Sequence, residues 1–232
     1  MRLDSFEWIT FDCYGTLIDW ETGIVTALGT VLGSHGIRWQ SEQILALYAQ
    51  LESDLESETR EYTPYRNVLA QVVIGFGERL GFVPTASEVR SLPDSLSSWR
   101  PFPDTVPALR KLKQRFFKLG IISNTDDDLF AETAKHLQID FDEVVTAQQA
   151  RSYKPALNNF RLAIQRIGVP KEKILHVAQS VYHDIIPARG LGLATVWVNR
   201  RGGRPGSGAT KSALGNPDLE VKALKTLAAM AS

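Results

Sequence analysis

Short apolar runs that suit buried strands alternate with stretches of helical periodicity along the second half of the chain. The expected strands cover residues 118–124, 141–146, 174–178 and 194–198. The expected helices cover residues 104–116, 127–137, 157–167 and 183–190. Alternation of strands and helices at this spacing predicts a doubly wound parallel sheet.

The first half has a different pattern. Trp8, Ile9 and Phe11 indicate one buried strand, and residues 19–98 then read as a long helical tract without an obvious strand. Apolar residues recur there at helical spacing in two stripes, Ile44, Tyr48, Leu51 and Leu55, and Val68, Val72, Phe76 and Leu80. Acidic residues lie largely opposite the first stripe and are assigned to a solvated face: Glu52, Asp54, Glu56 and Glu58.

Because the first strand must join the later sheet, the helical tract is an insertion. The fold class predicted is α/β, a Rossmann-like doubly wound parallel sheet core with an inserted all-helical cap. Residues 1–17 and 99–232 would form the core and residues 18–98 the cap. Residues 91–103, with three prolines, are expected to be a return linker, and the Gly-, Pro-, Ser- and Arg-rich residues 201–216 a mobile loop.

Composition narrows the class of protein without naming a function. The 232 residues are 44% hydrophobic with zero formal net charge, which suits a packed core and gives no reason to expect nucleic acid or an acidic membrane as a partner. Apolar runs are too short to span a membrane, and no signal-peptide pattern opens the chain. The single cysteine, Cys13, excludes an internal disulfide, so we expect a soluble cytoplasmic protein.

Asp12 stands where the first strand should end, and Gly15 permits a sharp turn after it. Ligands of open α/β sheets bind just beyond the carboxyl ends of strands, so this carboxylate is expected at the mouth of a cleft. It could be a covalent nucleophile, or simply the cap of the next helix.

Three later segments also place polar side chains beyond strand ends. Ser123 and Asn124 end one strand and could cap a helix or donate hydrogen bonds to an anion beside Asp12. Lys154 precedes a helix; it is either a surface lysine or the cation that keeps Asp12 ionised and attracts an anionic substrate. In the last segment, which includes Ser180, Asp184 could cap a helix or orient a water molecule.

These four segments, in this order and with a cap after the first, resemble the motifs of the haloacid dehalogenase superfamily over essentially the whole chain. Asp-Cys-Tyr-Gly-Thr at 12–16 and Trp-Val-Asn-Arg at 197–200 look like the 2-haloacid dehalogenase branch. The resemblance implies that Asp12 attacks a substrate carbon and forms an ester that water hydrolyses. Around that site it places Thr16, Ser123, Asn124, Lys154, Ser180 and Asp184, and we expect Cys13, Tyr14 and His183 to line the substrate pocket.

Two positions separate dehalogenase from phosphatase chemistry within this resemblance. Phosphatases of the superfamily carry a second Asp two residues after the nucleophile, where this chain has Tyr14, and a metal-binding carboxylate in the last motif, where it has Gln179. A halide leaves without a proton, and a singly charged haloacid needs no metal between carboxylates. Hydrolysis at carbon without metal or other cofactor is therefore favoured, with Mg²⁺ expected only for a phosphatase.

The chain also departs from the dehalogenase pattern. The arginine that receives the halide falls at Ala49, a pocket tyrosine at Phe160 and a pocket asparagine at Val181. Four cap residues could form another anion site or lie on the surface: Arg60, Tyr62, Tyr65 and Arg66.

The leading hypothesis is a hydrolase with an Asp nucleophile and a covalent ester intermediate, acting on a short 2-haloacid. The alternatives are an Mg²⁺-dependent small-molecule phosphatase and a non-catalytic relative that binds a small anion. The partner expected is a small anionic substrate, with a homodimer as a possible assembly.

Overall fold

The structure, a computed structural model, describes residues 1–58, 62–115, 117–204 and 206–231. A parallel sheet of six strands forms its centre, in the order β3-β2-β1-β4-β5-β6. The strands are β1 (Trp8–Phe11), β2 (Lys118–Ser123), β3 (Glu143–Thr146), β4 (Ile174–Ala178), β5 (Ala194–Val198) and β6 (Leu219–Val221). The predicted parallel sheet and its α/β class are confirmed.

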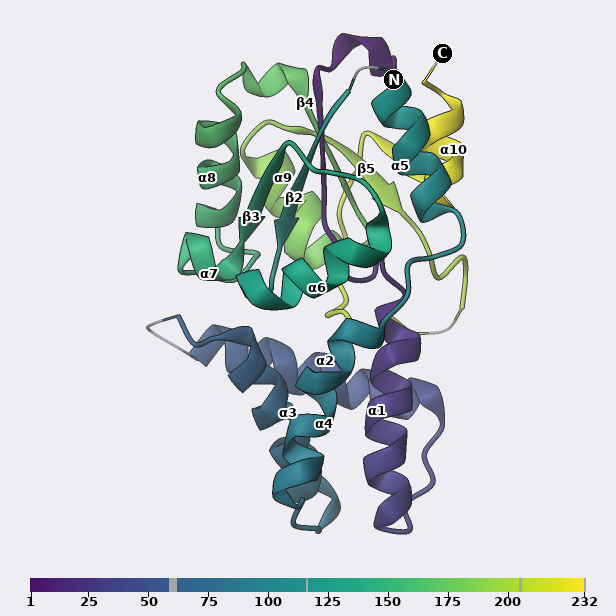
Figure 1. Cartoon of the computed structure of the whole chain (residues 1–232), viewed down its shortest axis with the longest axis vertical. Coiled ribbons are helices and arrows are strands. Elements are labelled where there is room, and N and C mark those ends of the chain that lie inside the picture. The colour runs from purple at the N-terminus through teal and green to yellow at the C-terminus, as the bar shows by residue number, and fades with distance from the viewer. Residues whose placement is uncertain (59–61, 116, 205, 232) are drawn as a thin grey trace.

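Helices of the sheet layer cover both faces of the sheet (Figure 1). They are α5 (Thr105–Gln114), α6 (Asp127–Leu137), α7 (Ala147–Ala150), α8 (Asn158–Ile167), α9 (Ile186–Gly190) and α10 (Leu224–Ala229). Alternate strand residues enter two apolar clusters: Ile9 and Phe11 pack in the cluster that holds residues of α5, α6 and α10, whereas Trp8 packs in the cluster that holds residues of α8 and α9. This alternation is what a strand buried on both faces requires.

Four helices between β1 and β2 form a separate layer beyond the sheet (Figure 1). They are α1 (Trp20–Ser34), α2 (Ser41–Glu58), α3 (Tyr65–Leu80) and α4 (Ala86–Ser95). The two apolar stripes predicted for this tract pack α2 against α3, since Tyr48, Val72 and Phe76 are fully buried. We use the word cap for α1–α4; the domain boundaries at residues 17/18 and 98/99 stay a prediction.

Several of the limits expected for helices and for the linker were wrong. The return linker expected at 91–103 begins inside α4, which includes Pro93, and continues as a 3₁₀ turn at Leu96–Ser98. Burial of Leu92, Leu96 and Trp99 outweighs the helix-breaking tendency of Pro93. The helix expected at 183–190 begins earlier, as a π-helix over Val181–Ile185, and α9 follows it. Strand β6 and helices α7 and α10 were not predicted.

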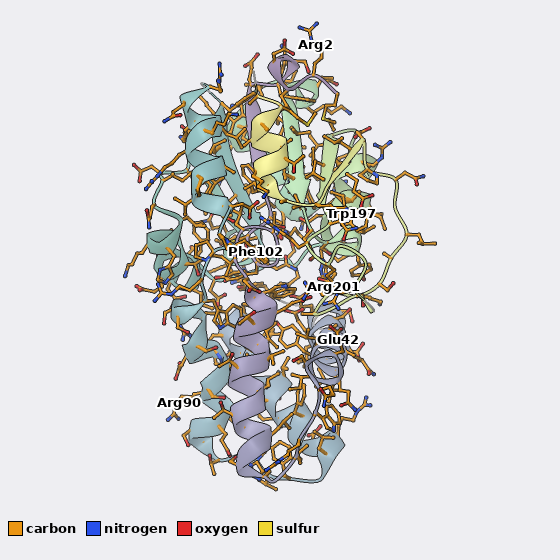
Figure 2. All side chains as sticks on the ribbon, turned by 90° about the vertical axis from the view of Figure 1, so that its right-hand side faces the viewer. Arg2, Glu42, Arg90, Phe102, Trp197 and Arg201 are labelled. Atoms are coloured by element: carbon orange, nitrogen blue, oxygen red, sulfur yellow. The ribbon has the colours of Figure 1, made fainter. Side chains whose placement is uncertain are left out.

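The segment 201–216, expected to be a mobile loop, is anchored to the rest of the molecule. It has no regular helix or strand among its described residues, but Arg201, Ala209 and Thr210 are buried. Arg201 forms ion pairs with Glu21 of α1 at 2.8 Å and with Glu42 of α2 at 2.7 Å. Figure 2 shows Arg201 and Glu42 at the junction between the cap and the sheet layer, so this segment ties the two together.

Candidate active site

Asp12 follows the last residue of β1, at the centre of the sheet. Its backbone N–H donates to the Val177 carbonyl at 3.1 Å, which continues the pairing of β1 with β4 past the strand end. Gly15 has φ +89°, and a Cβ there would lie 2.7 Å from Nε1 of Trp20. Only glycine therefore fits this turn, which leads from the Asp12 carboxylate directly into the first cap helix.

Lys154 is the centre of the charge arrangement. Its Nζ donates to Asp12 Oδ1 at 3.0 Å, to Asp184 Oδ1 at 2.7 Å and to the Ile122 carbonyl at 2.7 Å. The side chain is 1% exposed, so the surface position that we considered for Lys154 is excluded. One ammonium group thus connects the carboxylates that follow β1 and β4.

The three groups shift one another's protonation. Burial raises the pKa of Asp12, and Asp184 raises it further, whereas Lys154 opposes both effects. Burial also disfavours the charged form of Asp184, but Lys154 and the hydrogen bond from His176 hold the pKa of Asp184 below its ordinary value. The two carboxylates together raise the pKa of Lys154 against the effect of burial. Lys154 is therefore a permanent cation here, and Asp184 is its ionised partner.

Hydroxyl and amide groups fix the geometry around this centre. Thr16 Oγ1 donates to Asp12 Oδ2 at 2.6 Å and accepts the Gln179 N–H at 2.8 Å. Asn124 accepts the Lys154 N–H at 2.7 Å and donates to the Lys154 carbonyl at 3.0 Å, which holds the lysine backbone in place. Ser123 Oγ is buried and has no hydrogen-bond partner within the part of the chain that the structure describes.

Three further expected pocket residues differ in their positions. Tyr14 lines the cavity, and its hydroxyl is hydrogen-bonded to Thr133 Oγ1 at 2.8 Å. Cys13 is fully buried in the apolar core and is not among the cavity-lining residues, so the expectation that it lines the pocket was wrong. His183 lines the cavity beside Ser180, whose Oγ accepts the His183 N–H at 3.0 Å, and burial lowers the pKa of His183 to about 4.

The sequence interpretation missed His176. It lies on β4, fully buried, with Nε2 at 3.0 Å from Asp184 Oδ1 and Nδ1 at 3.0 Å from Thr10 Oγ1. Since the carboxylate can only accept, the hydrogen on Nε2 points at Asp184. The Thr10 hydroxyl is the hydrogen-bond partner of Nδ1. A histidine inside the apolar run at 174–178 was the available signal.

Two carboxyl groups of the cap also line the cavity, contrary to the solvated face assigned to them. Glu52 is 4% exposed, and the Glu56 side chain is 7% exposed. Glu52 Oε1 accepts from Tyr48 at 2.7 Å and from Tyr65 at 2.6 Å. Burial raises the pKa of Glu52 to about 7 and the pKa of Glu56 well above its ordinary value. Asp54, between them on α2, is exposed as expected.

The alternative anion site that we considered for the cap does not form among the described residues. Tyr62 donates to Asp126 and Tyr65 to Glu52, while Arg66 pairs with Asp128 on the exposed surface at 2.6 Å. Arg60 lies outside the described residues.

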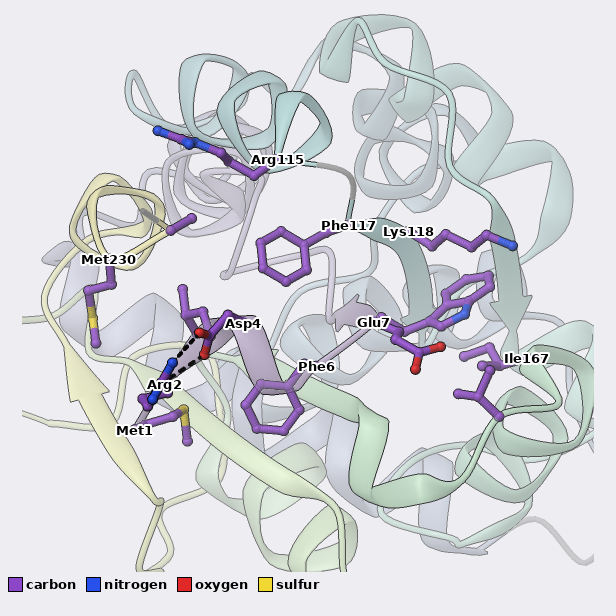
Figure 3. Close-up of a pocket in the computed structure, with 14 residues that line it drawn as sticks. Met1, Arg2, Asp4, Phe6, Glu7, Arg115, Phe117, Lys118, Ile167 and Met230 are labelled. Carbon is purple, nitrogen blue, oxygen red and sulfur yellow. Dashed lines mark hydrogen bonds and ion pairs between the residues drawn. The ribbon is translucent and has the colours of Figure 1, made fainter.

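The cavity at this site is small, about 30 Å³, and lies between the strand ends and the cap. Its walls come from both layers: Asp12, Tyr14, Trp20, Glu52, Glu56, Tyr65, Ser123, Asn124, Lys154, Ser180, His183 and Asp184. A larger cavity of about 640 Å³ opens at the other end of the strands, where the Arg2–Asp4 ion pair, Trp8 and Lys118 line it (Figure 3). None of the motif residues reaches that larger cavity, so the small one is the candidate active site.

No cluster of three or more His, Cys, Asp or Glu side chains suited to a metal ion occurs within the described ranges. Nor does any helix in the described part of the chain have the length and apolar character needed to cross a bilayer.

A family model described as haloacid dehalogenase-like hydrolase matches residues 6–192. The chain belongs to this family. An (S)-2-haloacid dehalogenase from Pseudomonas sp. (strain YL) is 28% identical over 97% of this chain and 94% of its own length. The solved L-2-haloacid dehalogenase from Xanthobacter autotrophicus, with chloropropionic acid covalently bound, superimposes with a TM-score of 0.79 at 20% identity, over 97% of this chain and 98% of that chain. The α/β fold of the haloacid dehalogenases is thus shared along nearly the whole chain.

A phosphatase of the same family is also similar to part of the chain. The glyceraldehyde 3-phosphate phosphatase of Methanothermobacter thermautotrophicus is 30% identical over 66% of this chain and 67% of its own length. Fold and family are therefore compatible with both dehalogenase and phosphatase chemistry. The residues of the cavity have to distinguish between the two reactions.

The three departures from the dehalogenase pattern are apolar residues that do not line the cavity. Ala49 on α2 and Phe160 on α8 are buried, and Phe160 packs edge-on against His176 of β4. Neither they nor Val181 lines the cavity. Among the described lining residues, Lys154 is the one permanent cation.

Proposed function

We propose that this hydrolase cleaves the carbon–halogen bond of a short 2-haloacid, with Asp12 as nucleophile and an Asp12 ester as intermediate. The observation that carries the proposal is the contact of Lys154 with both Asp12 and Asp184 in the wall of a cavity. The similarity along the whole chain to (S)-2-haloacid dehalogenases supports the substrate class.

Binding of the substrate would use the unpartnered donor of the core. Ser123 Oγ lines the cavity without another hydrogen-bond partner among the described residues, and Lys154 lies beside it in the wall. A substrate carboxylate that accepts from Ser123 would have its negative charge near the Lys154 ammonium. This would present the adjacent carbon to Asp12.

Displacement would proceed by attack of one Asp12 oxygen on the carbon that carries the halogen, and the halide would leave with the bonding electrons. Thr16 and Lys154 hold one oxygen of Asp12 each, which orients the carboxylate for attack. In the second step a water molecule would attack the ester carbonyl of Asp12. Asp184 would accept a proton from that water, since its Oδ2 has no other partner among the described residues.

We infer that no metal takes part. The position of the phosphatase acid holds Tyr14, whose hydroxyl is engaged with Thr133, and Gln179 replaces the metal-binding carboxylate of the last motif. Asp12 and Asp184 share Lys154 instead, so a cation already occupies the place between the two carboxylates. The partial identity with a phosphatase makes an Mg²⁺-dependent phosphatase the second candidate function.

The test is a panel of 2-haloacids and small phosphoesters, assayed with and without a chelator. We expect halide release that survives exhaustive chelation, and no phosphate release. In a single turnover in ¹⁸O-water with excess enzyme, the label should enter Asp12 before it enters the product, and Asp12→Asn should release no halide. Label found only in the product would exclude the ester, and activity restored by Mg²⁺ after chelation would place the phosphatase first.

A further inference from the structure

Glu56 reaches the candidate cavity from helix α2 of the cap, whereas Asp12 reaches it from the sheet layer. Asp12 enters from the sheet layer, and displacement at carbon is in line, so the leaving group of a bound substrate points away from Asp12 and toward the cap. The described cap residues in the wall are Trp20, Glu52, Glu56 and Tyr65. The halogen therefore faces carboxyl groups and aromatic rings in this part of the cavity.

Of the two cap carboxyl groups, Glu56 is the one that is open to a ligand. Glu52 is engaged by two short hydrogen bonds, from Tyr48 and Tyr65. Among the residues that the structure describes, Glu56 has only long contacts: both of its oxygens lie 3.4 Å from Asn124 Nδ2, and Oε2 lies 3.9 Å from His183 Nε2. A short hydrogen bond from Glu56 to a ligand would therefore displace no strong interaction.

The surroundings of Glu56 favour its neutral form. Its pKa is raised by burial and by Glu52, and Lys154 opposes this only in part because that ammonium is already shared by two carboxylates. The titratable and charged groups that face it are Asp12, Tyr14, Tyr153, Lys154, His183 and Asp184 from the sheet layer, Tyr48 and Glu52 from α2, and Tyr65 from α3. An anionic substrate adds another negative charge, so a proton on Glu56 is favoured further when substrate binds.

We propose that Glu56 is a substrate-contacting residue that donates a hydrogen bond to the leaving group, and that the site is built for the carbon–fluorine bond of a small 2-fluoro acid. The inference rests on the proposed function. Fluoride is a strong hydrogen-bond acceptor and leaves poorly without a donor, whereas bromide and iodide are weak acceptors that leave without help. A neutral carboxyl group can donate the hydrogen bond that fluoride needs in order to leave, and it accelerates the departure of bromide or iodide very little.

The reaction balances without an additional reactant. The bond from an Asp12 oxygen to the substrate carbon forms while the carbon–fluorine bond breaks, and fluoride departs with the bonding electrons. The Glu56 proton stays on its carboxyl group and is shared with fluoride by a hydrogen bond. Water then hydrolyses the ester as in the proposed function.

The experiment compares fluoride release from fluoroacetate with bromide release from bromoacetate, measured with ion-selective electrodes. Glu56→Ala removes the donor, Glu56→Gln keeps a donor that cannot ionise, and Asp54→Ala is the matched control on the exposed side of α2. We expect Glu56→Ala to lower fluoride release about tenfold to a hundredfold, the size of one lost hydrogen bond to a charged group, and to change bromide release much less. Asp54→Ala should change neither.

The pH profile distinguishes donation from packing. Wild-type fluoride release should fall at high pH as Glu56 loses its proton, because the anion can no longer donate and repels fluoride. Glu56→Gln should keep most of the activity and lose this high-pH decline. An unchanged decline in Glu56→Gln would overturn the proposal, even if Glu56→Ala fails to fold by circular dichroism.

Failure of the proposed function is recognised separately by intact mass spectrometry after mixing with bromoacetate. If wild-type protein releases no bromide and forms no Asp12 ester, dehalogenation itself is wrong and the role of Glu56 is wrong with it. If the ester forms but Glu56→Ala changes fluoride and bromide release equally, or the wild type releases no fluoride, the dehalogenase function stands and the role of Glu56 is overturned.

Discussion

At the scale of single residues, the site is a chain of buried polar groups with Lys154 at its centre. From Thr10 it runs through His176 and Asp184 to Lys154 and Asp12, and each neighbouring pair lies at 3.0 Å or less. Each member is costly to bury alone, so each is held by the others. Removing the one cation should therefore affect stability as well as chemistry.

Lys154→Met tests this dependence. The substitution leaves Asp12 and Asp184 as buried carboxyl groups without a counter-charge, so their pKa values rise and folding costs more near neutral pH. We expect a loss of about 3–5 kcal/mol in the free energy of unfolding at pH 7, together with loss of halide release. The deficit should shrink on acidification, when both carboxyl groups take up protons. Urea unfolding with equal stability of both proteins at pH 7 would contradict the central role of Lys154.

Glu52→Gln should stabilise the protein at alkaline pH. Burial raises the pKa of Glu52 to about 7, so the unfolded chain releases this proton at lower pH than the folded one. Folding stability is then lost as pH rises from the unfolded pKa through the folded pKa. The rise from 4.5 to about 7 corresponds to about 3 kcal/mol above pH 7.

Glutamine cannot ionise but can still accept from Tyr48 and Tyr65, so the variant should match wild type near pH 4 and exceed it near pH 8. Thermal unfolding across this range provides the measurement. Parallel profiles of stability against pH for the two proteins would show that Glu52 has the same pKa in the folded and unfolded states.

At the scale of elements, the site residues beyond the strand ends were predictable from the sequence. The side of helix α2 that faces the cavity was not. Asp12, Ser123 and Lys154 stand at fixed places relative to apolar strands, and a parallel sheet brings such positions to one edge. Helix α2 carries acidic residues around an apolar stripe, and helical periodicity alone cannot show that one acidic edge faces another layer of the molecule. Glu52 and Glu56 were therefore assigned to solvent.

His176 was missed for a related reason. A lone polar residue in an apolar strand run acquires a partner only through tertiary contact with Asp184, eight residues later, across the turn after β4. Pro93 was read as a linker residue because the buried partners that hold α4 together lie in other elements. Local sequence favours an element, and packing between elements decides these cases.

The junction between cap and sheet layer provides a prediction at this scale. Arg201 is nearly buried and pairs with Glu21, whose side chain is 14% exposed, and with Glu42, whose side chain is 45% exposed. Arg201→Ala should lower the free energy of unfolding by about 2–3 kcal/mol, because Glu21 loses its main counter-charge. Glu42→Ala should cost less than about 1 kcal/mol, as for other exposed pairs. Urea titrations of both variants measure the free energy of unfolding. Equal losses in the two variants would contradict the larger contribution that we assign to the pair of Arg201 with Glu21.

At the scale of the whole molecule, two layers close on a cavity of about 30 Å³. Residues from the strand ends form its floor, and residues of α1, α2 and α3 form the facing wall. Such a volume is about that of one water molecule. We therefore expect the two layers to separate when an organic acid enters and to close most fully around the smallest one.

Substrate size should consequently control the rate. For chloroacetate, 2-chloropropionate and 2-chlorobutyrate, kcat/KM should fall by about tenfold or more with each added carbon, since one extra methylene in a hydrophobic pocket changes kcat/KM by about 10-fold to 200-fold. The aromatic rings of Tyr14, Trp20 and Tyr65 in the wall cannot compress to accommodate a longer chain. Arg201→Ala, which loosens the junction, should flatten this gradient by raising the relative kcat/KM of the longest acid. Equal kcat/KM values along the series in the wild type would mean that the closed cavity is not the state in which substrate reacts.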